Sequence, residues 1–552
     1  MKIKIPITFS ATAPESRWSP GIRFRKPRHA NLLPQVDLNP GATRLFPVRK
    51  RTLRIYLTLV ILLAAVWPAP SRSALFKVGP DYRRPTNAVP PNYKASDLGQ
   101  WKTGQPLDHL PKGEWWTVFG DEHLNALERR ATVFNQELRA AAARVEQARA
   151  VARVSRSELL PVLNADPVWR RERYSPNQVP SFGDITANTF RAPLDLSYEI
   201  DLWGRVRRGF EGARAEAAAA TAAFHSVLLL LQADVAQNYF ALRALDSEIA
   251  TVARTIDLRR EQVQLVRSRF EGGIGNELDV ARAETELATT ETEAAGLERR
   301  RSELENALAI LIGDHPSSFQ LSRLESNTGS WRAALPEIPA GLPADLLERR
   351  PDVAEAERQL AAANARIGVA KAAFFPVLRL TGSGGFVSGE LDNLFNWDSR
   401  VWSIGPSISL PIFAGGRNRA NYRRAQSAFE EAVAKYRHRV LVAFGEVENH
   451  LAALHFLSIE AAAQDRAVAN ARRAADLAQD RYRAGIVSYL EVVDASRAAL
   501  QTERRRTQLI AERLVASVQL IKALGGGWSD SGFGVVNREV STSASGQGGA
   551  VR

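Results

Sequence analysis

A glycine-containing stretch that occurs twice constrains the fold of this 552-residue chain more than any other feature. The first copy covers residues 269–280, and the second covers residues 481–492, which lie 212 residues later. Each copy joins two long segments whose apolar residues have helical spacing. A repeat of this kind predicts two long helical hairpins that are built on one plan.

The segments that flank the two turns are long and free of helix-breaking residues. No proline occurs between Pro193 and Pro316, and none follows Pro411. Their richness in Ala, Arg, Glu, Leu and Gln is typical of long helices that pack side by side. We therefore predict hairpins over residues 205–312 and 417–524. The longer helix of each would span about 100 Å, because each helical residue adds ~1.5 Å.

Two segments with alternating apolar and polar residues precede each hairpin, and this period of two predicts β-strands. In the clearest example, Phe190, Ala192 and Leu194 alternate with charged or polar neighbours. The predicted strands cover residues 161–172 and 189–202 in the first half, and residues 376–386 and 401–412 in the second half.

The chain therefore divides into two similar halves with additional segments at its ends. We expect a first repeat over residues 75–340, of which residues 313–340 are a connector rich in Pro and Ser. A second repeat is expected over residues 341–528, followed by a flexible tail over residues 529–552. A basic region, a short apolar run and small residues predict a secretory signal peptide over residues 48–74, with a membrane anchor as the alternative.

Residues 1–47 do not fit a signal peptide, because they are rich in Pro and Arg and lack periodicity. We expect them to be disordered or a mis-assigned extension, with translation beginning near Val48. This leader also explains the net charge of +13, since residues 1–54 hold twelve Lys or Arg and only Glu15 and Asp37. The rest of the chain is close to neutral, which argues against a nucleic-acid partner.

No set of residues in the sequence predicts catalysis, a metal site or a cofactor. The chain has no Cys, so disulfides, thiolates and lipidation on Cys are excluded. His450 and His455 lie five residues apart, which is not the spacing of a helical zinc pair. We expect a protein that is not an enzyme.

Strands of about ten residues with one apolar face match the strands of transmembrane barrels. A sheet in lipid must close on itself, and the smallest barrels need about eight strands, so four strands require several copies. Periodicity leaves a dimer and a trimer open. The alternative is a small soluble sheet whose apolar face covers a core. The chain would then be a periplasmic coiled-coil structural or adaptor protein.

Several motifs occur in an order and spacing that resemble the outer membrane factor family, the TolC/OprM-type exit ducts of tripartite efflux systems. The likeness is greater to its OprM branch, and it covers residues 78–528. The motifs are Val78-Gly79-Pro80-Asp81-Tyr82, Trp115-Trp116, Leu342-Pro343, Leu346-Leu347, Arg350-Pro351-Asp352-Val353, Pro411-Ile412-Phe413 with Gly415-Gly416-Arg417, and Leu524-Gly525-Gly526-Gly527-Trp528.

This resemblance implies an α+β membrane protein with a tandem internal repeat. Three copies would form a twelve-stranded transmembrane β-barrel, with four strands from each, and a periplasmic α-barrel of helical hairpins. The connector and the chain ends would form an equatorial region. The implied function is an outer membrane duct that passively conducts small molecules such as drugs. The implied partners are a homotrimer, a periplasmic adaptor, an inner-membrane pump of the resistance-nodulation-division class, and outer membrane lipid.

One departure from the family concerns the N-terminal lipid anchor. Many relatives carry a lipidated Cys just before the Val-Gly-Pro motif, whereas this chain has Phe76 at the equivalent position. We therefore expect attachment through the barrel alone.

The resemblance also assigns a gate to the second turn. It places Leu490 and Asp494 at the constriction, with Arg497 nearby, and it aligns Glu491 with another acidic gate position. Asp279 is the counterpart of Glu491 in the first repeat. A ring of carboxylates favours cations, and a ring of leucines blocks a pore by dewetting. The alternative for Asp494 is a solvated position or an ion pair with Arg497, three residues later.

The two turns are expected at the periplasmic tips, where the adaptor docks. Their glycines are Gly272, Gly273, Gly275 and Gly485. We expect a positive φ angle at Gly272 and Gly485, because a tight reversal needs it. The acidic residues and Leu490 after the second turn predict that this copy forms the gate.

Overall fold

The computed structural model describes residues 77–84, 114–177, 185–323, 336 and 350–526. The predicted leader, the signal peptide, the C-terminal tail and much of the connector lie outside these residues. Within them the protein is mostly helical with one sheet.

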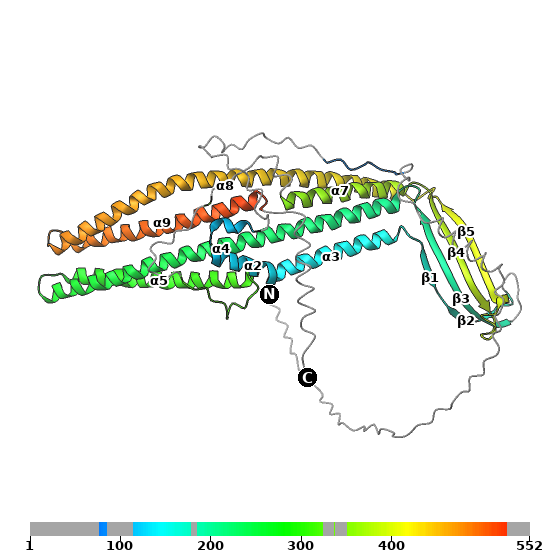
Figure 1. Ribbon diagram of the computed structural model, residues 1–552, viewed down its shortest axis with the longest axis horizontal. Helices are drawn as coiled ribbons and strands as arrows, with labels where there is room; N and C mark the ends of the chain where they lie inside the picture. The colour runs from blue at the N-terminus through cyan, green and yellow to red at the C-terminus, as the bar shows by residue number, and fades with distance from the viewer. Residues whose placement is uncertain (1–76, 85–113, 178–184, 324–335, 337–349, 527–552) are drawn as a thin grey trace, which may run out of the picture. The chain divides into compact units, whose positions relative to one another are not determined.

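Two helical hairpins of equal size dominate the described residues (Figure 1). The first consists of α4 (Arg205–Glu271) and α5 (Glu277–Leu311), and the second of α8 (Arg417–Arg483) and α9 (Tyr489–Ala523). The two long helices have 67 residues each and the two partners have 35 each. The long hairpins expected from the repeat are therefore present in both halves.

The remaining helices precede the strands of each half. The 3-10 helix η3 (Trp115–Phe119) leads into α2 (Glu122–Phe134) and α3 (Gln136–Ser157), and α7 (Pro351–Ala372) precedes the second pair of strands. Asp121 caps α2 by accepting hydrogen bonds from the backbone N–H groups of His123 and Leu124.

All the strands belong to one antiparallel sheet in the order β1 or β2, β3, β4, β5. The strands are β1 (Val162–Ala165), β2 (Val168–Tyr174), β3 (Ile185–Ile200), β4 (Val377–Ser388) and β5 (Arg400–Ser409), with the short 3-10 helix η5 (Trp397–Ser399) before β5. β1 and β2 both pair with β3, and the same register continues across the gap between them. β1 and β2 together correspond to the single strand predicted over residues 161–172. The strand is interrupted at Pro167, which has no N–H to donate.

The two faces of this sheet differ in chemistry. Residues that lie directly opposite each other in an antiparallel pair share a face, so the register assigns each side chain to a face. On one face, Leu196 of β3 lies beside Gly382 of β4, which lies beside Ile404 of β5. That face is apolar and much of it is exposed, as at Leu163, Leu194, Trp402, Ile404 and Ile408. The opposite face carries Asp195, Ser383 and Ser403.

The sheet lies at the end of the helices where α4 and α8 begin, and both hairpin turns lie at the other end (Figure 1). Beside the sheet, α3 packs on α4, α4 on α7 and α7 on α8. The Val78–Tyr82 motif packs against these helices. The buried side chain of Arg208 on α4 donates to the carbonyl oxygen of Pro80 at 2.7 Å. Gly368 makes room for it, because a Cβ there would lie 2.9 Å from the side chain of Arg208.

The main apolar core surrounds the middle of α4, where η3, α2, α5 and α9 meet it. Phe119 and Phe240 contact each other there with ring centroids 4.9 Å apart and ring planes inclined at 58°. The core also buries Glu128 completely, and neither of its carboxylate oxygens has a hydrogen-bond partner among the described residues. Burial raises the pKa of Glu128 well above its ordinary value of 4.5, because the apolar core disfavours the charged carboxylate.

Candidate gate at the hairpin turns

The two turns have the same backbone geometry. In the first, the N–H of Ile274 donates to the carbonyl of Arg269, and the N–H of Gly273 donates to that of Phe270. In the second, Ile486 and Gly485 make the equivalent bonds. This pair of bonds defines a Schellman motif, whose glycine adopts the left-handed conformation. Gly273 has a φ of 75° and Gly485 one of 73°.

The prediction of a positive φ is therefore right for Gly485 and wrong for Gly272. Gly272 has a φ of −76°, because it caps the end of α4 in a right-handed conformation, and its neighbour Gly273 makes the reversal. Ala484 occupies the equivalent position in the second turn with a φ of −75°. Gly275 meets a different requirement, since a Cβ there would lie 2.7 Å from the backbone nitrogen of Phe270.

The two turns of one chain pack against each other. The guanidinium of Arg269 donates to the carbonyl oxygens of Tyr482 at 3.0 Å and Arg483 at 2.9 Å. It also lies over the ring of Tyr482, 4.6 Å from the centroid. Tyr482 and Tyr489 contact each other with centroids 5.4 Å apart. Burial raises the pKa of Tyr489 to about 12, so its hydroxyl stays neutral.

An apolar cluster continues this contact along the helices. It joins α4 and α5 of the first hairpin to α8 and α9 of the second. Its buried members are Val263, Val266, Ala283, Tyr482, Tyr489, Val492 and Val493.

The predicted gate residues of the second turn lie on the exposed side of α9. Leu490 is 42% exposed, and Glu491 and Asp494 are exposed next to it. They are thus brought together on one helix and are available to a pore or to another copy. In the first hairpin, Asp279 lies 3.5 Å from Arg282 in an ion pair, and its side chain is 23% exposed. The two copies therefore differ, because the acidic residue of the first is already paired.

Arg497 does not pair with Asp494. Its guanidinium donates instead to the carboxylate of Glu286 on α5, and this hydrogen bond raises the pKa of Arg497 above its ordinary value. Glu286 is 8% exposed and also forms an ion pair with Arg259 of α4 at 3.0 Å. These three residues, the Arg259–Glu286–Arg497 set, connect three helices from both hairpins.

Sequence reasoning missed Arg259 and Glu286. A signal was present, because Glu286 lies on the buried stripe of α5 with Ala283, Thr290 and Leu297, where an apolar residue is the norm. A second set lies nearer the main core, where Arg504 of α9 contacts Glu248 at 2.6 Å and Glu293 at 3.0 Å. Ion pairs thus link the two hairpins at two positions along the helices.

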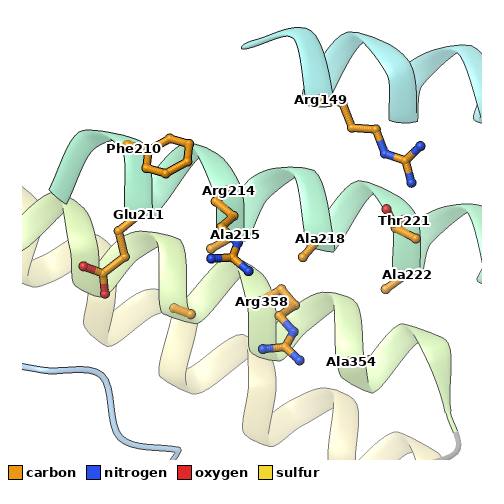
Figure 2. A pocket seen from close by; sticks show the side chains of 11 residues that line it. Arg149, Phe210, Glu211, Arg214, Ala215, Ala218, Thr221, Ala222, Ala354 and Arg358 are labelled. Carbon is orange, nitrogen blue, oxygen red and sulfur yellow. The ribbon is translucent and has the colours of Figure 1, made fainter. Parts of the chain in front are cut away.

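A hollow of about 640 Å³ lies elsewhere, on the surface of α3, α4 and α7 (Figure 2). Arg149, Arg214 and Arg358 surround it, one from each helix, and alanines form much of its lining. The hollow arises because these small side chains leave space between the helices. Its lining holds no pairing of nucleophile and base. No group of His, Asp and Glu suited to a metal occurs among the residues that the structure describes.

Residues 127–314 and 342–526 match the family described as Outer membrane efflux protein, and each range contains one hairpin. The chain is 37% identical over 462 residues to the Solvent efflux pump outer membrane protein SrpC of Pseudomonas putida, covering 82% of this chain and 95% of SrpC. It is 33% identical over 452 residues to the Cation efflux system protein CusC of Escherichia coli, with the same coverage of both chains.

Among solved structures, the outer-membrane channel OprN is similar with a TM-score of 0.76 and 31% identity, over 82% of this chain and 99% of OprN. The alternative of a periplasmic structural or adaptor protein does not fit these relatives. The chain belongs to the outer membrane efflux protein family and is an exit duct of an efflux system in the outer membrane.

Proposed function

We propose that three copies of this chain close their sheets into one twelve-stranded barrel and their helices into a tunnel, through which small molecules pass without chemical change. The observation that carries this proposal is the open sheet with one exposed apolar face. Both edges, at β1 and β2 on one side and β5 on the other, lack a partner strand among the described residues. An open edge is not tolerated in lipid, so neighbouring copies would pair these edges.

The apolar face would contact lipid, and the polar face would line the lumen. Trp402, Ile404 and Ile408 of β5 are 79%, 66% and 73% exposed, which is costly in water for a surface of this size. Four strand positions per chain fit a trimer of twelve strands. The bilayer thickness fits as well, because β5 has 10 residues and a tilted strand needs about 9–11 to cross.

The gate would form at the second turn of each copy. Three copies of Leu490 would narrow the pore, and three carboxylates each from Asp494 and Glu491 would favour cations there. Arg497 would act indirectly, since its contact with Glu286 positions α9 against the first hairpin. Asp279 would contribute less, because Arg282 neutralises it locally.

The partners proposed for the duct are a periplasmic adaptor and an inner-membrane pump of the resistance-nodulation-division class. The adaptor would dock at the turns that contain Gly272, Gly273, Gly275 and Gly485, where Ile274 and Ile486 are 85% and 67% exposed. The names of the relatives include a solvent efflux pump and a cation efflux system, so the fold serves different substrates. We propose that the pump, rather than the duct, selects the substrate.

Cysteine labelling tests which face of the sheet contacts lipid. The natural chain has no Cys, so a single introduced thiol reports without background. Ser403→Cys lies on the polar face and Ile404→Cys next to it on the apolar face, and both positions are exposed in the single chain. We expect a membrane-impermeant maleimide to label Ser403→Cys in intact outer membranes and to spare Ile404→Cys until denaturation. Equal labelling of both would contradict a barrel in lipid.

Conductance in planar bilayers tests the gate. The variant Leu490→Ala with Asp494→Ala should raise the conductance of the closed duct and reduce its preference for cations. The control removes a leucine and an acidic residue after the first turn, Leu278→Ala with Asp279→Ala, and we expect little change there. A wild-type conductance in the first variant, or equal effects in both, would remove these residues from the gate.

A further inference from the structure

The apolar face of the sheet ends in arginines at the edge farthest from the helices. Trp169 of β2 lies directly opposite Phe190 of β3, and their rings stack with centroids 6.3 Å apart. Side chains alternate along a strand, so Arg171 and Arg173 follow Trp169 on the same face. The order along this face is therefore apolar residues, an aromatic pair and then two cations.

Arg170 provides a contrast on the same strand. It points to the opposite face and forms an ion pair with Glu172 at 3.5 Å. Arg171 lies directly opposite Asn188 and makes no ion pair among the described residues. Arg171 on the apolar face is thus left without an acidic partner among the described residues, whereas Arg170 on the polar face has one.

A similar arrangement occurs at the other edge of the sheet. Arg400 lies opposite Phe386 in the register of β4 and β5, and therefore shares the apolar face with Trp402. Its Nε donates to the backbone oxygen of Trp397 at 2.7 Å. Both free edges of the sheet consequently combine a tryptophan with an arginine at this end.

Aromatic girdles mark the boundary between hydrocarbon and headgroups around membrane barrels. A cation just beyond the girdle lies at the level of the lipid headgroups. Arg171 and Arg173 are two residues apart, which separates their backbones by about 7 Å. Guanidinium groups bind phosphate through two parallel hydrogen bonds, so this pair suits a ligand with more than one phosphate.

We propose that Arg171 and Arg173 form a binding site for the phosphate groups of lipopolysaccharide, the phosphorylated glycolipid of the outer leaflet. This proposal rests on the proposed membrane insertion of the sheet. It follows from the direction of the sheet, because the helices extend from one end and β2, which contains both arginines, lies at the other end (Figure 1). Lipid bound there would cover an edge strand, β2, where two copies of the chain would meet.

The test measures binding of purified diphosphoryl lipid A to the detergent-solubilised protein by native mass spectrometry. Arg171→Ser with Arg173→Ser should weaken binding about tenfold, because two charge-assisted contacts to phosphate are lost. Arg170→Ser is the matched control and should bind like the wild type. Arg171→Lys with Arg173→Lys should bind with intermediate affinity, since charge is kept and the bidentate geometry is lost.

Two further ligands separate the sources of phosphate. Dephosphorylated lipid A should bind as weakly to the wild type as diphosphoryl lipid A does to the double Ser variant. Phosphatidylglycerol should bind less tightly than diphosphoryl lipid A, because it offers a single phosphate. Equal binding by wild type and double Ser variant, or a preference for phosphatidylglycerol, would overturn the proposal.

The labelling of Ile404→Cys distinguishes the two levels of failure. If that thiol reacts with the aqueous maleimide in intact membranes, the membrane insertion itself is wrong. If the thiol is protected but the double Ser variant binds lipid A normally, only the lipopolysaccharide site is wrong.

Discussion

Gly273 and Gly485 give the two hairpin turns their shared left-handed backbone. An alanine in this conformation costs about 1–2 kcal/mol, because its Cβ approaches the following carbonyl oxygen. We predict that Gly485→Ala increases local opening of the second turn by about tenfold or more. Hydrogen exchange of the amides in residues 481–492 measures this effect.

Gly272→Ala is the matched control for this substitution. Gly272 has a φ of −76° and its counterpart in the second turn is already Ala484. Exchange in the first turn should therefore change little. A large increase for Gly272→Ala, or none for Gly485→Ala, would contradict the assignment of the reversal to the second glycine of the pair.

Glu128 predicts a pH dependence of stability. Its folded pKa is raised by burial, whereas its unfolded pKa stays near 4.5. Between these two values the folded protein binds more protons than the unfolded chain, so stability falls as pH rises, by up to about 1.4 kcal/mol per pH unit. Glu128→Gln has no proton to lose and should remove this fall.

Thermal unfolding of wild type and Glu128→Gln between pH 5 and 9 checks the prediction. The difference in melting temperature between the two proteins should grow with pH and favour the variant. A constant difference over this range would show that the pKa of Glu128 in the folded protein is not raised above its value in the unfolded chain.

At the scale of single residues, the sequence supplied the gate candidates only through a family resemblance. Leu490 and Asp494 are indeed exposed next to each other on α9, but helical spacing alone would also have allowed an ion pair between Asp494 and Arg497. Arg497 turns instead to Glu286, 211 residues away in the sequence. A contact between distant segments leaves no local pattern, so the Arg259–Glu286–Arg497 set could not be predicted in this way.

At the scale of elements, the sequence predicted the helices well because proline and glycine mark their ends. The hairpin expected over residues 205–312 begins at Arg205 and its second helix ends at Leu311, one residue before the expected end. The strands were located less accurately. β3 begins at Ile185 rather than at residue 189, and β5 ends at Ser409, before the expected residue 412. Strand ends depend on the partner strand, and the partner's position is a property of the fold.

The ion pair between Arg497 and Glu286 holds the second hairpin against the first. Arg497 is half-exposed, so we expect its removal to weaken this contact by about 1 kcal/mol. Arg497→Ala should therefore raise the open probability of the duct about fivefold in planar bilayers. Arg505→Ala is the control, because Arg505 contacts Glu512 and Glu460 within its own hairpin. Equal open probabilities for the two variants would contradict this role.

Glu286→Gln should have a larger effect than Arg497→Ala. The substitution leaves the buried guanidinium of Arg259 without its carboxylate, and removing one partner of a buried pair costs about 3 kcal/mol or more. The same recordings check this order. A smaller effect for Glu286→Gln than for Arg497→Ala would show that the buried Arg259–Glu286 pair is not the main contact that keeps the duct closed.

At the scale of the whole molecule, the sheet cannot exist in a membrane as a single chain. Its apolar face is exposed and its two edges lack partner strands among the described residues. The sequence alone predicted that copies must associate, but it did not decide between two copies and three. Alternation of apolar and polar residues indicates which face is apolar and not how strongly the strands tilt. The curvature that selects a number of copies arises only when the edges pair.

Subunit counting tests the central claim of this account most directly. Native mass spectrometry of the outer membrane protein in mild detergent gives the number of chains in the assembled duct. We predict three copies, corresponding to twelve strand positions around one barrel. A stable assembly of two copies, or a monomer that remains in aqueous buffer without detergent, would contradict it.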